Sequence, residues 1–214
     1  MSRSMKRNEI TWKSNSGVRR YARTRYRGID QRLLSLRELA IVKKLLSGIR
    51  KEDLTILDVP CGYGRFVPLL SKLCLALVCG DLNIHALSYA KATHKWIRCW
   101  VNCDVLNLPF KEASFDVVFD FRLLQHFDSL ESVIAVLKEF QRVSKKFILF
   151  SIYTESWLHG LVRKFRKRTH RIKMFNKATL RSRLKKAGFK IKAEVGVFPG
   201  VHAHTIYLVE KRNE

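Results

Sequence analysis

The chain has 214 residues, of which 47% are hydrophobic and 11% aromatic, and 42 Lys and Arg against 18 Asp and Glu give a formal net charge of +24. This length and composition predict one globular domain, or one domain with a small appendage, and exclude wholesale disorder or a collagen-like repeat. No apolar run reaches the roughly 18 residues of a membrane span, and no apolar stretch follows the basic start as in a secretion signal.

Short apolar runs alternate with helical patterns along the chain, which predicts an α/β fold with stacked β-α units. Ahead of the first run, helical spacing predicts a helix over residues 30–46. The runs expected to form a mostly parallel sheet are 54–59, 75–80, 96–102, 115–121 and 147–152. Helices are expected at 65–73, at 86–93, after the N-cap Ser129, and at 177–187 before Gly188. Two closing strands, 189–197 and 205–209, flank a turn at Pro199-Gly200.

The positive charge is concentrated in two segments. Residues 1–50 carry a net charge of +11 and residues 151–190 a net charge of +12, whereas residues 51–150 carry only +1. One basic helix is usually a solvated face, but two such segments attract polyanions or anionic membrane surfaces. The sequence therefore predicts an anionic partner for the two basic segments, whereas the central region is nearly neutral.

Cysteine usage points to a reducing compartment. The five cysteines are odd in number and form no Cys-x-x-Cys pair; they are Cys61, Cys74, Cys79, Cys99 and Cys103. Neither a disulfide framework nor a zinc knuckle is indicated. We expect reduced, mostly buried thiols in a cytoplasmic protein, which could also contact a membrane peripherally, with an organelle transit peptide as the alternative interpretation of the Arg- and Ser-rich start.

The most informative motif lies where the first predicted strand meets the first helix, at Leu57-Asp-Val-Pro-Cys-Gly-Tyr-Gly-Arg65. Its two glycines allow a sharp turn and a close approach of the backbone to a ligand. About 20 residues on, at the next strand end, Asp81 can accept both hydroxyls of a ribose. At the third strand end, Asp104 can accept an adenine amine while its apolar neighbours cover the ring. These carboxylates should converge on one crevice.

With these motifs the sequence, from about Leu54 to Asn213, resembles the class I S-adenosylmethionine-dependent methyltransferases, in particular the methyltransferase type 11-like group. The resemblance implies a Rossmann-like fold with a seven-stranded, mostly parallel sheet and helices on both faces. It implies S-adenosylmethionine as cofactor, with the first loop at the methionine part, Asp81 at the ribose and Asp104 at the adenine. The cofactor-binding residues implied in this way are Asp58, Pro60, Cys61, Gly62, Gly64, Asp81, Leu82, Asp104, Val105 and Asp120.

The sequence departs from the family pattern at two places, and it lacks the residues that two rival motifs require. Pro60 stands where the family usually has the first glycine, and the residues 143–146 replace its Lys-Pro-Gly-Gly turn. A dinucleotide-binding Rossmann enzyme requires a third glycine where this chain has Val67, and no Gly-Lys-Ser/Thr of a P-loop occurs. The methyltransferase interpretation is therefore favoured over both.

The residues that could touch an acceptor follow the fourth strand or precede the sheet. His126 is the candidate general base, with a helix cap or loop support as the alternative. Arg122 and Gln125 could orient a substrate or lie exposed on the surface. Tyr21 and Tyr26 could close over the cofactor or substrate, or simply pack on the sheet.

Two further histidines lie near the predicted closing strands. His202 and His204 are expected to be surface residues of an edge strand, because no carboxylate or Cys accompanies them at ligand spacing. No metal site is predicted.

The family resemblance gives the basic segments a place. It implies that residues 1–50, a basic helical segment, and a basic insertion at 153–176 within a methyltransferase domain of residues 51–214 lie on the substrate side. The run 157–175 has the pattern of an amphipathic helix on anionic lipid, of an RNA-contacting segment, or of a lid helix with a solvated basic side.

These patterns lead to one functional prediction and two rivals. We expect methyl transfer to an anionic small-molecule or lipid-linked acceptor. An RNA methyltransferase is the alternative within the same chemistry. A non-catalytic basic binding module with the same fold is the alternative outside it.

Overall fold

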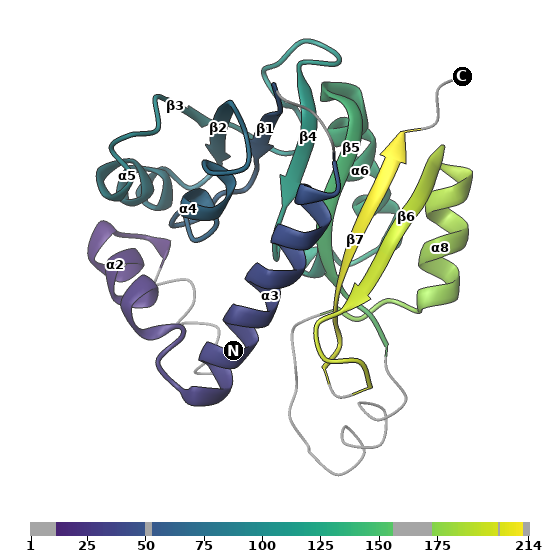
Figure 1. The fold of residues 1–214 in the computed structure, drawn as a ribbon, viewed down its shortest axis with the longest axis horizontal. Coiled ribbons are helices and arrows are strands. Elements are labelled where there is room, and N and C mark those ends of the chain that lie inside the picture. Colours follow the sequence, from purple (N-terminus) through teal and green to yellow (C-terminus); the bar gives the residue numbers. More distant parts are fainter. Residues whose placement is uncertain (1–11, 50–52, 156–172, 201, 212–214) are drawn as a thin grey trace.

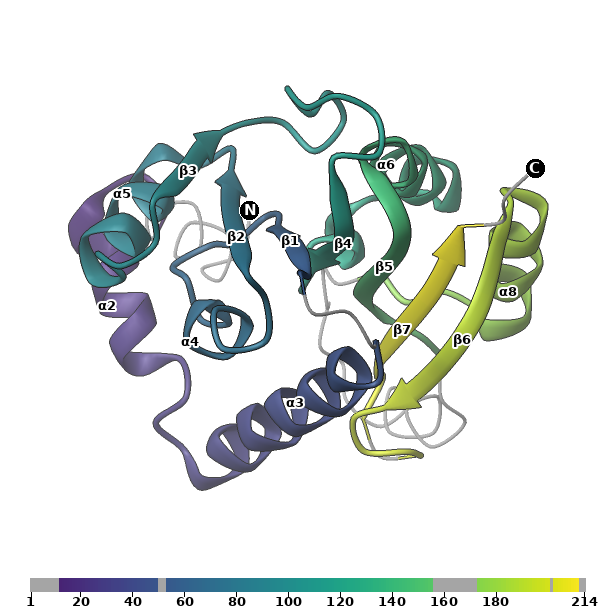
Figure 2. The same cartoon turned by 45° about the horizontal axis from the view of Figure 1, so that its top comes forward.

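The protein forms a seven-stranded sheet with helices on both faces (Figures 1 and 2). The computed structural model describes residues 12–49, 53–155, 173–200 and 202–211. The strands, in chain order, are β1 Thr55–Asp58, β2 Ala76–Asp81, β3 Cys99–Asn102, β4 Phe115–Asp120, β5 Ser144–Tyr153, β6 Phe189–Gly196 and β7 His204–Lys211. The helices are α2 Asn15–Thr24, α3 Ile29–Ser47, α4 Val67–Leu70, α5 Ile84–Thr93, α6 Leu130–Val143 and α8 Lys177–Lys186, with a 3-10 turn at Leu124–His126.

The strand order in the sheet is β3-β2-β1-β4-β5-β7-β6. The first five strands pair in parallel, and β7 pairs antiparallel with both β5 and β6. Because the chain order reverses between β1 and β4, a crevice opens beyond the carboxyl ends of these strands, which is where open α/β sheets bind ligands. The predicted α/β class and the seven-stranded, mostly parallel sheet are confirmed.

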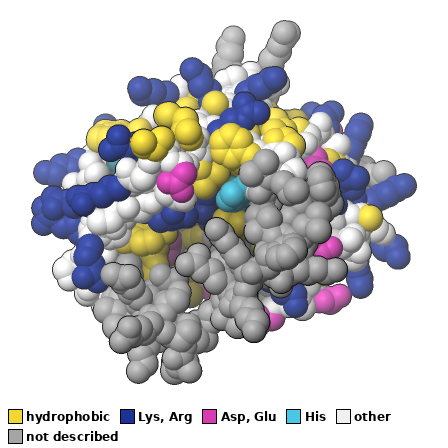
Figure 3. Space-filling view, turned by 90° about the horizontal axis from the view of Figure 1, so that it is seen from below, with side chains coloured by type: hydrophobic (Ala, Val, Ile, Leu, Met, Phe, Trp, Pro, Cys, Tyr) yellow, Lys and Arg dark blue, Asp and Glu magenta, His cyan; other side chains and the backbone are white. Residues whose placement is uncertain are grey.

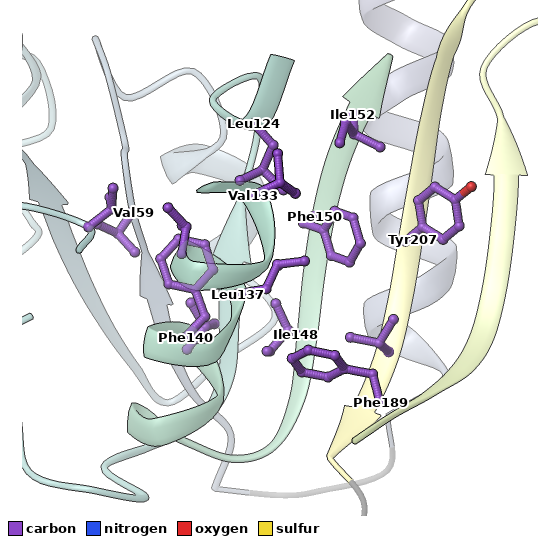
Figure 4. Close-up of a cluster of buried hydrophobic side chains, with 14 of the residues drawn as sticks. Val59, Leu124, Val133, Leu137, Phe140, Ile148, Phe150, Ile152, Phe189 and Tyr207 are labelled. Atoms are coloured by element: carbon purple, nitrogen blue, oxygen red, sulfur yellow. The ribbon is translucent and has the colours of Figure 1, made fainter. Parts of the chain in front are cut away.

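Two hydrophobic clusters lie on the two faces of the sheet. Figure 4 shows the cluster on the α6 side, where Leu137 and Phe140 of the helix meet Ile148 and Phe150 of β5. The second cluster joins the inner face of α3 to the opposite side of β1, β4 and β7. Figure 2 shows α3 and α4 on one face and α6 and α8 on the other. Both faces of the central strands are thus buried, as their uninterrupted apolar sequences predict.

Side-chain caps fix several helix starts. Asn83, Ser129 and Asn176 each accept a hydrogen bond from a backbone N–H of the first turn that follows. Gly188 has a φ of 87° directly after the cap of α8, the left-handed conformation that ends helices. The predicted cap at Ser129 and the helix end at Gly188 are confirmed.

Three sequence-based expectations differ from the structure. The predicted helix 65–73 is regular only over α4, because beyond Leu70 the hydrogen bonds tighten to i→i−3: the backbone N–H groups of Lys72 and Leu73 donate to the carbonyls of Leu69 and Leu70. The predicted strand 96–102 begins at Cys99, since the preceding residues form a turn in which the backbone N–H of Ile97 donates to the carbonyl of His94.

The third correction concerns His204. It is fully buried on β7, an internal strand, whereas β6 forms the edge, so it is not the exposed edge residue that was predicted. Among the described residues no helix is long and apolar enough to cross a membrane. The five thiols are free: Cys61, Cys79 and Cys103 are buried, Cys74 is half-buried and Cys99 is exposed.

Candidate active site

A cavity of about 770 Å³ lies at the carboxyl ends of the central strands. It contains most of the predicted site residues: Tyr21, Tyr26, Asp58, Pro60, Cys61, Gly62, Asp81, Leu82, Asp104, Val105, Arg122, Gln125 and His126. Figure 3 views this end of the molecule; Lys and Arg side chains lie around its periphery, and hydrophobic and histidine side chains lie nearer its middle. Acidic groups line one part of the cavity and arginines the other, and we call these parts the acidic half and the basic half.

The acidic half is organised around Asp81 at the end of β2. Its Oδ2 accepts the backbone N–H of Gly62 at 2.8 Å, and its Oδ1 accepts that of Asn83 at 2.7 Å. Gly62 has a φ of 57°, and a Cβ at this position would meet no protein atom within 4 Å. The glycine therefore leaves open backbone beside a buried carboxylate that retains free lone pairs.

Asp58, at the end of β1, is a second carboxyl group of the acidic half. It is 2% exposed, and its Oδ2 has no hydrogen-bond partner among the described residues. Burial, with a smaller contribution from the charge of Asp81, raises the pKa of Asp58 to about 8. A buried acceptor without a partner is costly, so this oxygen is suited to a ligand that donates a hydrogen bond or carries positive charge.

Asp104 and two leucines complete the acidic half. Asp104 is exposed, and its Oδ1 accepts the backbone N–H of Leu106 at 3.0 Å. Leu82 and Leu106 line the cavity with exposed fractions of 66% and 51%. Exposed aliphatic side chains beside a carboxylate can cover the faces of an aromatic ring whose amine the carboxylate accepts.

Two predicted site residues, Gly64 and Asp120, are absent from the cavity lining. Gly64 has a φ of 80°, and a Cβ there would lie 2.6 Å from Cδ2 of His94, so a glycine is required by the packing at this position. Asp120 is fully buried at the end of β4, and burial together with the charge of Asp58 raises its pKa well above the ordinary carboxyl value.

The basic half is held by Glu38, a residue that the sequence analysis did not identify. Its buried carboxylate pairs with Arg65 Nη1 at 2.6 Å, Arg122 Nη2 at 2.5 Å and His204 Nδ1 at 2.9 Å. Burial alone would raise the pKa of Glu38, but the hydrogen bond from His204 and the charges of Arg122 and Arg65 outweigh it and lower the pKa to about 2. The available signal was a lone acid on the apolar stripe of the helix, between Leu34 and Ile41.

Arg122 is fixed at the end of β4 and faces the cavity. It has a φ of 68°; its backbone N–H donates to Ser151 Oγ at 2.8 Å, and its Nη1 donates to the Tyr153 hydroxyl at 3.2 Å. Its side chain is only 19% exposed. The arginine is thus a half-buried, oriented cation, and the alternative of simple surface exposure is excluded.

Gln125 and His126 follow in the 3-10 turn. Gln125 is buried, its amide donates to the Arg122 carbonyl, and its Nε2 lies 3.3 Å from His126 Nε2. His126 lines the cavity and is exposed. Partial loss of solvent around the ring lowers the pKa of His126 below its ordinary value, so the neutral imidazole predominates at pH 7.

Helix α2 and the residues that follow it form part of the cavity wall. Tyr21 contacts Trp12 and Tyr63, with ring centroids 5.1 and 5.9 Å apart, and Arg65 lies over the ring of Tyr26 at 4.4 Å. Arg25 donates to the Gln31 amide oxygen at 2.6 Å. Both tyrosines therefore line the cavity and also pack on neighbouring aromatic or cationic side chains.

The predicted basic run 157–175 lies largely outside the residues that the structure describes. Within the described part of the chain, no group of three or more His, Cys, Asp or Glu is placed to hold a metal ion.

Comparison with known proteins agrees with this geometry. Residues 57–148 match the family described as "Methyltransferase domain". Magnesium protoporphyrin IX methyltransferase from Synechocystis, solved with bound S-adenosylhomocysteine, superposes with a TM-score of 0.77 at 15% identity, over 98% of this chain and 100% of that one. The structure therefore has the class I methyltransferase fold.

Two curated relatives match shorter stretches. One is the tRNA (carboxymethyluridine(34)-5-O)-methyltransferase alkbh8 of Xenopus tropicalis, 26% identical over 91 residues. The other is the uncharacterized protein MJ0638 of Methanocaldococcus jannaschii, 30% identical over 95 residues. These matches cover 42% and 44% of this chain, but only 14% and 38% of the relatives. Residues 57–148 thus match a methyltransferase domain, and the structural neighbour with the same fold was solved with bound S-adenosylhomocysteine.

Proposed function

We propose that this protein transfers a methyl group from S-adenosylmethionine to an anionic small-molecule or lipid-linked acceptor. The observation that carries the proposal is the division of one cavity into an acidic half, with Asp58, Asp81 and Asp104, and a basic half, with Arg25 and Arg122. A cationic, ribose-containing cofactor suits the first half, and an anion suits the second.

The acidic half fits the cofactor on features of this chain. The unpartnered Oδ2 of Asp58 is suited to the ammonium group of the cofactor's methionine part. Asp81 retains lone pairs for the ribose hydroxyls, and the open backbone at Gly62 leaves room for the cofactor to approach closely. Leu82 and Leu106 would cover the adenine, with Asp104 at its amine. Asp120 and Gly64 lie outside the lining of the cavity.

The bound cofactor supplies an electrophilic methyl group, whose transfer is an in-line displacement that depends chiefly on alignment. The chain contributes positioning. Arg122, held by Glu38 and Tyr153, binds the anion, with Arg25 as a second cation at the cavity wall. A carboxylate oxygen needs no base, and for a protonated acceptor the neutral imidazole of His126 can accept the proton.

RNA remains the second candidate acceptor. The name of the Xenopus relative describes methylation at a carboxymethyluridine of tRNA, and a carboxymethyl group is itself a carboxylate that would suit Arg122. The two basic segments of the sequence are also compatible with phosphate contacts. The third candidate, a non-catalytic basic module, is disfavoured by the buried unpartnered oxygen of Asp58, which is costly without a ligand.

Calorimetric titration of S-adenosylhomocysteine at pH 7, in two buffers of different ionisation enthalpy, tests the cofactor assignment. We expect micromolar binding accompanied by proton release, because the free Asp58 has a pKa of about 8 and a ligand ammonium group would lower it. Asp58→Asn should remove the proton release. Absence of binding would contradict the cofactor assignment and favour the alternative of a non-catalytic basic binding module.

The same samples are then titrated with total RNA and with anionic vesicles at two salt concentrations. Preferential binding of RNA by the cofactor-loaded protein would favour RNA as the acceptor over a small-molecule or lipid-linked one. Preferential binding of vesicles would support a lipid-linked acceptor.

A further inference from the structure

Helix α3 has a second apolar stripe, on the side away from the sheet. Ile29, Leu33 and Leu36 are 80%, 56% and 63% exposed, and Ala40 continues the row. Spacings of four, three and four residues place these side chains on one face of an α-helix. Figure 2 shows α3 at the edge of the molecule, and among the described residues no other helix or strand lies over its outer side.

This stripe is distinct from the face of α3 that builds the core. The inward face consists of Leu34, Ile41, Val42 and Leu46, all buried, with Glu38 among them. Scattered exposed leucines need no explanation, but a continuous apolar row opposite a complete core face marks a surface for interaction.

Basic side chains border the stripe on both sides. By helical geometry Arg32 and Lys43 lie along one edge and Arg37 and Lys44 along the other, and all four are exposed. The single exposed acid of the helix is Asp30, whose Oδ2 accepts the Gln31 amide at 3.0 Å. The exposed face is therefore apolar along its centre and positive along its margins.

We propose that the outer face of α3 docks on an anionic lipid bilayer. An apolar row between two rows of Lys and Arg is the arrangement of a helix that lies in the headgroup region, with its aliphatic side chains at the acyl boundary and its cations at lipid phosphates. RNA is disfavoured because bases stack on aromatic side chains, and this row is aliphatic throughout.

The docked face adjoins the cavity. Arg25 and Tyr26 of the cavity wall directly precede α3, and Glu38 on its inner side holds Arg122. Docking through α3 would bring the basic half close to the membrane surface, which favours a lipid-linked acceptor over a free one. Docking itself does not depend on methyl transfer, so cofactor binding provides a separate readout.

The principal experiment is flotation of the full-length protein with vesicles of phosphatidylcholine, with and without phosphatidylglycerol. One triple variant, with Ile29→Gln, Leu33→Gln and Leu36→Gln, keeps the net charge but removes the apolar stripe. We expect its partitioning onto anionic vesicles to fall by at least about tenfold. The control Leu75→Gln, Trp96→Gln removes exposed apolar side chains elsewhere and should partition as the wild type does.

A second pair of variants tests the basic margins. Arg32→Gln, Arg37→Gln, Lys43→Gln, Lys44→Gln should also lose binding to anionic vesicles. The matched control removes four exposed lysines from the α6, α8 and β6 side: Lys138, Lys185, Lys186 and Lys190, each to Gln. Equal losses in the two charge variants would show non-specific attraction and overturn the proposal, and so would wild-type partitioning of the stripe variant.

A gain-of-signal measurement covers the case in which a variant folds poorly. Leu33→Trp should show more quenching by brominated anionic lipid than the wild type shows, whereas Leu75→Trp should not. Absence of added quenching would overturn the proposal, as would a stripe variant that loses RNA binding but keeps vesicle binding. The affinity for S-adenosylhomocysteine, measured by calorimetric titration, is expected to be unchanged in every variant. This measurement separates failure of the docking proposal from failure of the proposed cofactor site.

Discussion

The two halves of the cavity are built in opposite ways. The carboxylates of the acidic half, Asp58, Asp81 and Asp104, stand at or just after three strand ends within one continuous stretch of chain. The basic half combines Arg25, Arg122 and Tyr153 from distant segments. One half is a local product of successive β-α units, and the other depends on long-range contacts made by α3.

The halves also differ in how their charges are satisfied. Asp58 is buried with a free oxygen, whereas Glu38 has three cationic or hydrogen-bonding partners. The acidic half therefore lowers its free energy when a cationic ligand arrives. The basic half is already stable without a ligand and still carries one excess positive charge, since Glu38 faces both Arg65 and Arg122.

The largest expected effect comes from breaking the basic half at its centre. Glu38→Ala leaves the guanidinium groups of Arg65 and Arg122, only 13% and 19% exposed, without their carboxylate. We expect the free energy of unfolding to fall by about 3 to 5 kcal/mol in urea denaturation. The control Glu131→Ala breaks an exposed pair with Arg183 and should cost at most about 1 kcal/mol. Equal small losses would contradict a stabilising role for Glu38.

The same group predicts the acid limit of stability. The pKa of Glu38 is depressed to about 2 in the folded protein, so its contribution is complete above the ordinary carboxyl pKa and is lost as the pH falls toward about 2. Glu38→Gln should be less stable than the wild type at neutral pH, and the difference should shrink in acid. A constant difference across that range would contradict the assignment.

The next effect breaks the acidic half and should leave the basic half intact. Asp81→Ala removes the proposed ribose acceptor and the partner of the Gly62 and Asn83 N–H groups. We expect the calorimetric affinity for S-adenosylhomocysteine to fall at least about 100-fold, because hydrogen bonds to a charged group are lost. Asp53→Ala, an exposed acid before β1 at the other end of the sheet, serves as control. A loss of only severalfold would count against the ribose assignment.

This contrast explains what the sequence could predict. Strand positions, the Gly62 turn and the three strand-end carboxylates follow from local patterns of apolar residues, glycine and acids. The Glu38–His204 pair joins residues 166 positions apart in the sequence. The burial of His204 follows from the position of β7 between β5 and the edge strand β6. No local pattern records either fact, so His204 was predicted as a surface residue. Gly64 was identified as a ligand contact, and the structure adds its packing on His94, which no local pattern records.

The smallest effect refines the apolar part of the acidic half. Leu82 is 66% exposed in the cavity wall, and a bound adenine would cover part of it. Leu82→Ala should weaken binding of S-adenosylhomocysteine by about fivefold without changing the unfolding free energy, because the side chain is buried only in the complex. Leu75→Ala, at a residue 72% exposed at the opposite end of β2, is the matched control and should bind normally. If both variants bound equally well, the adenine would lie elsewhere in the cavity, and the carboxylates alone would define the acidic half.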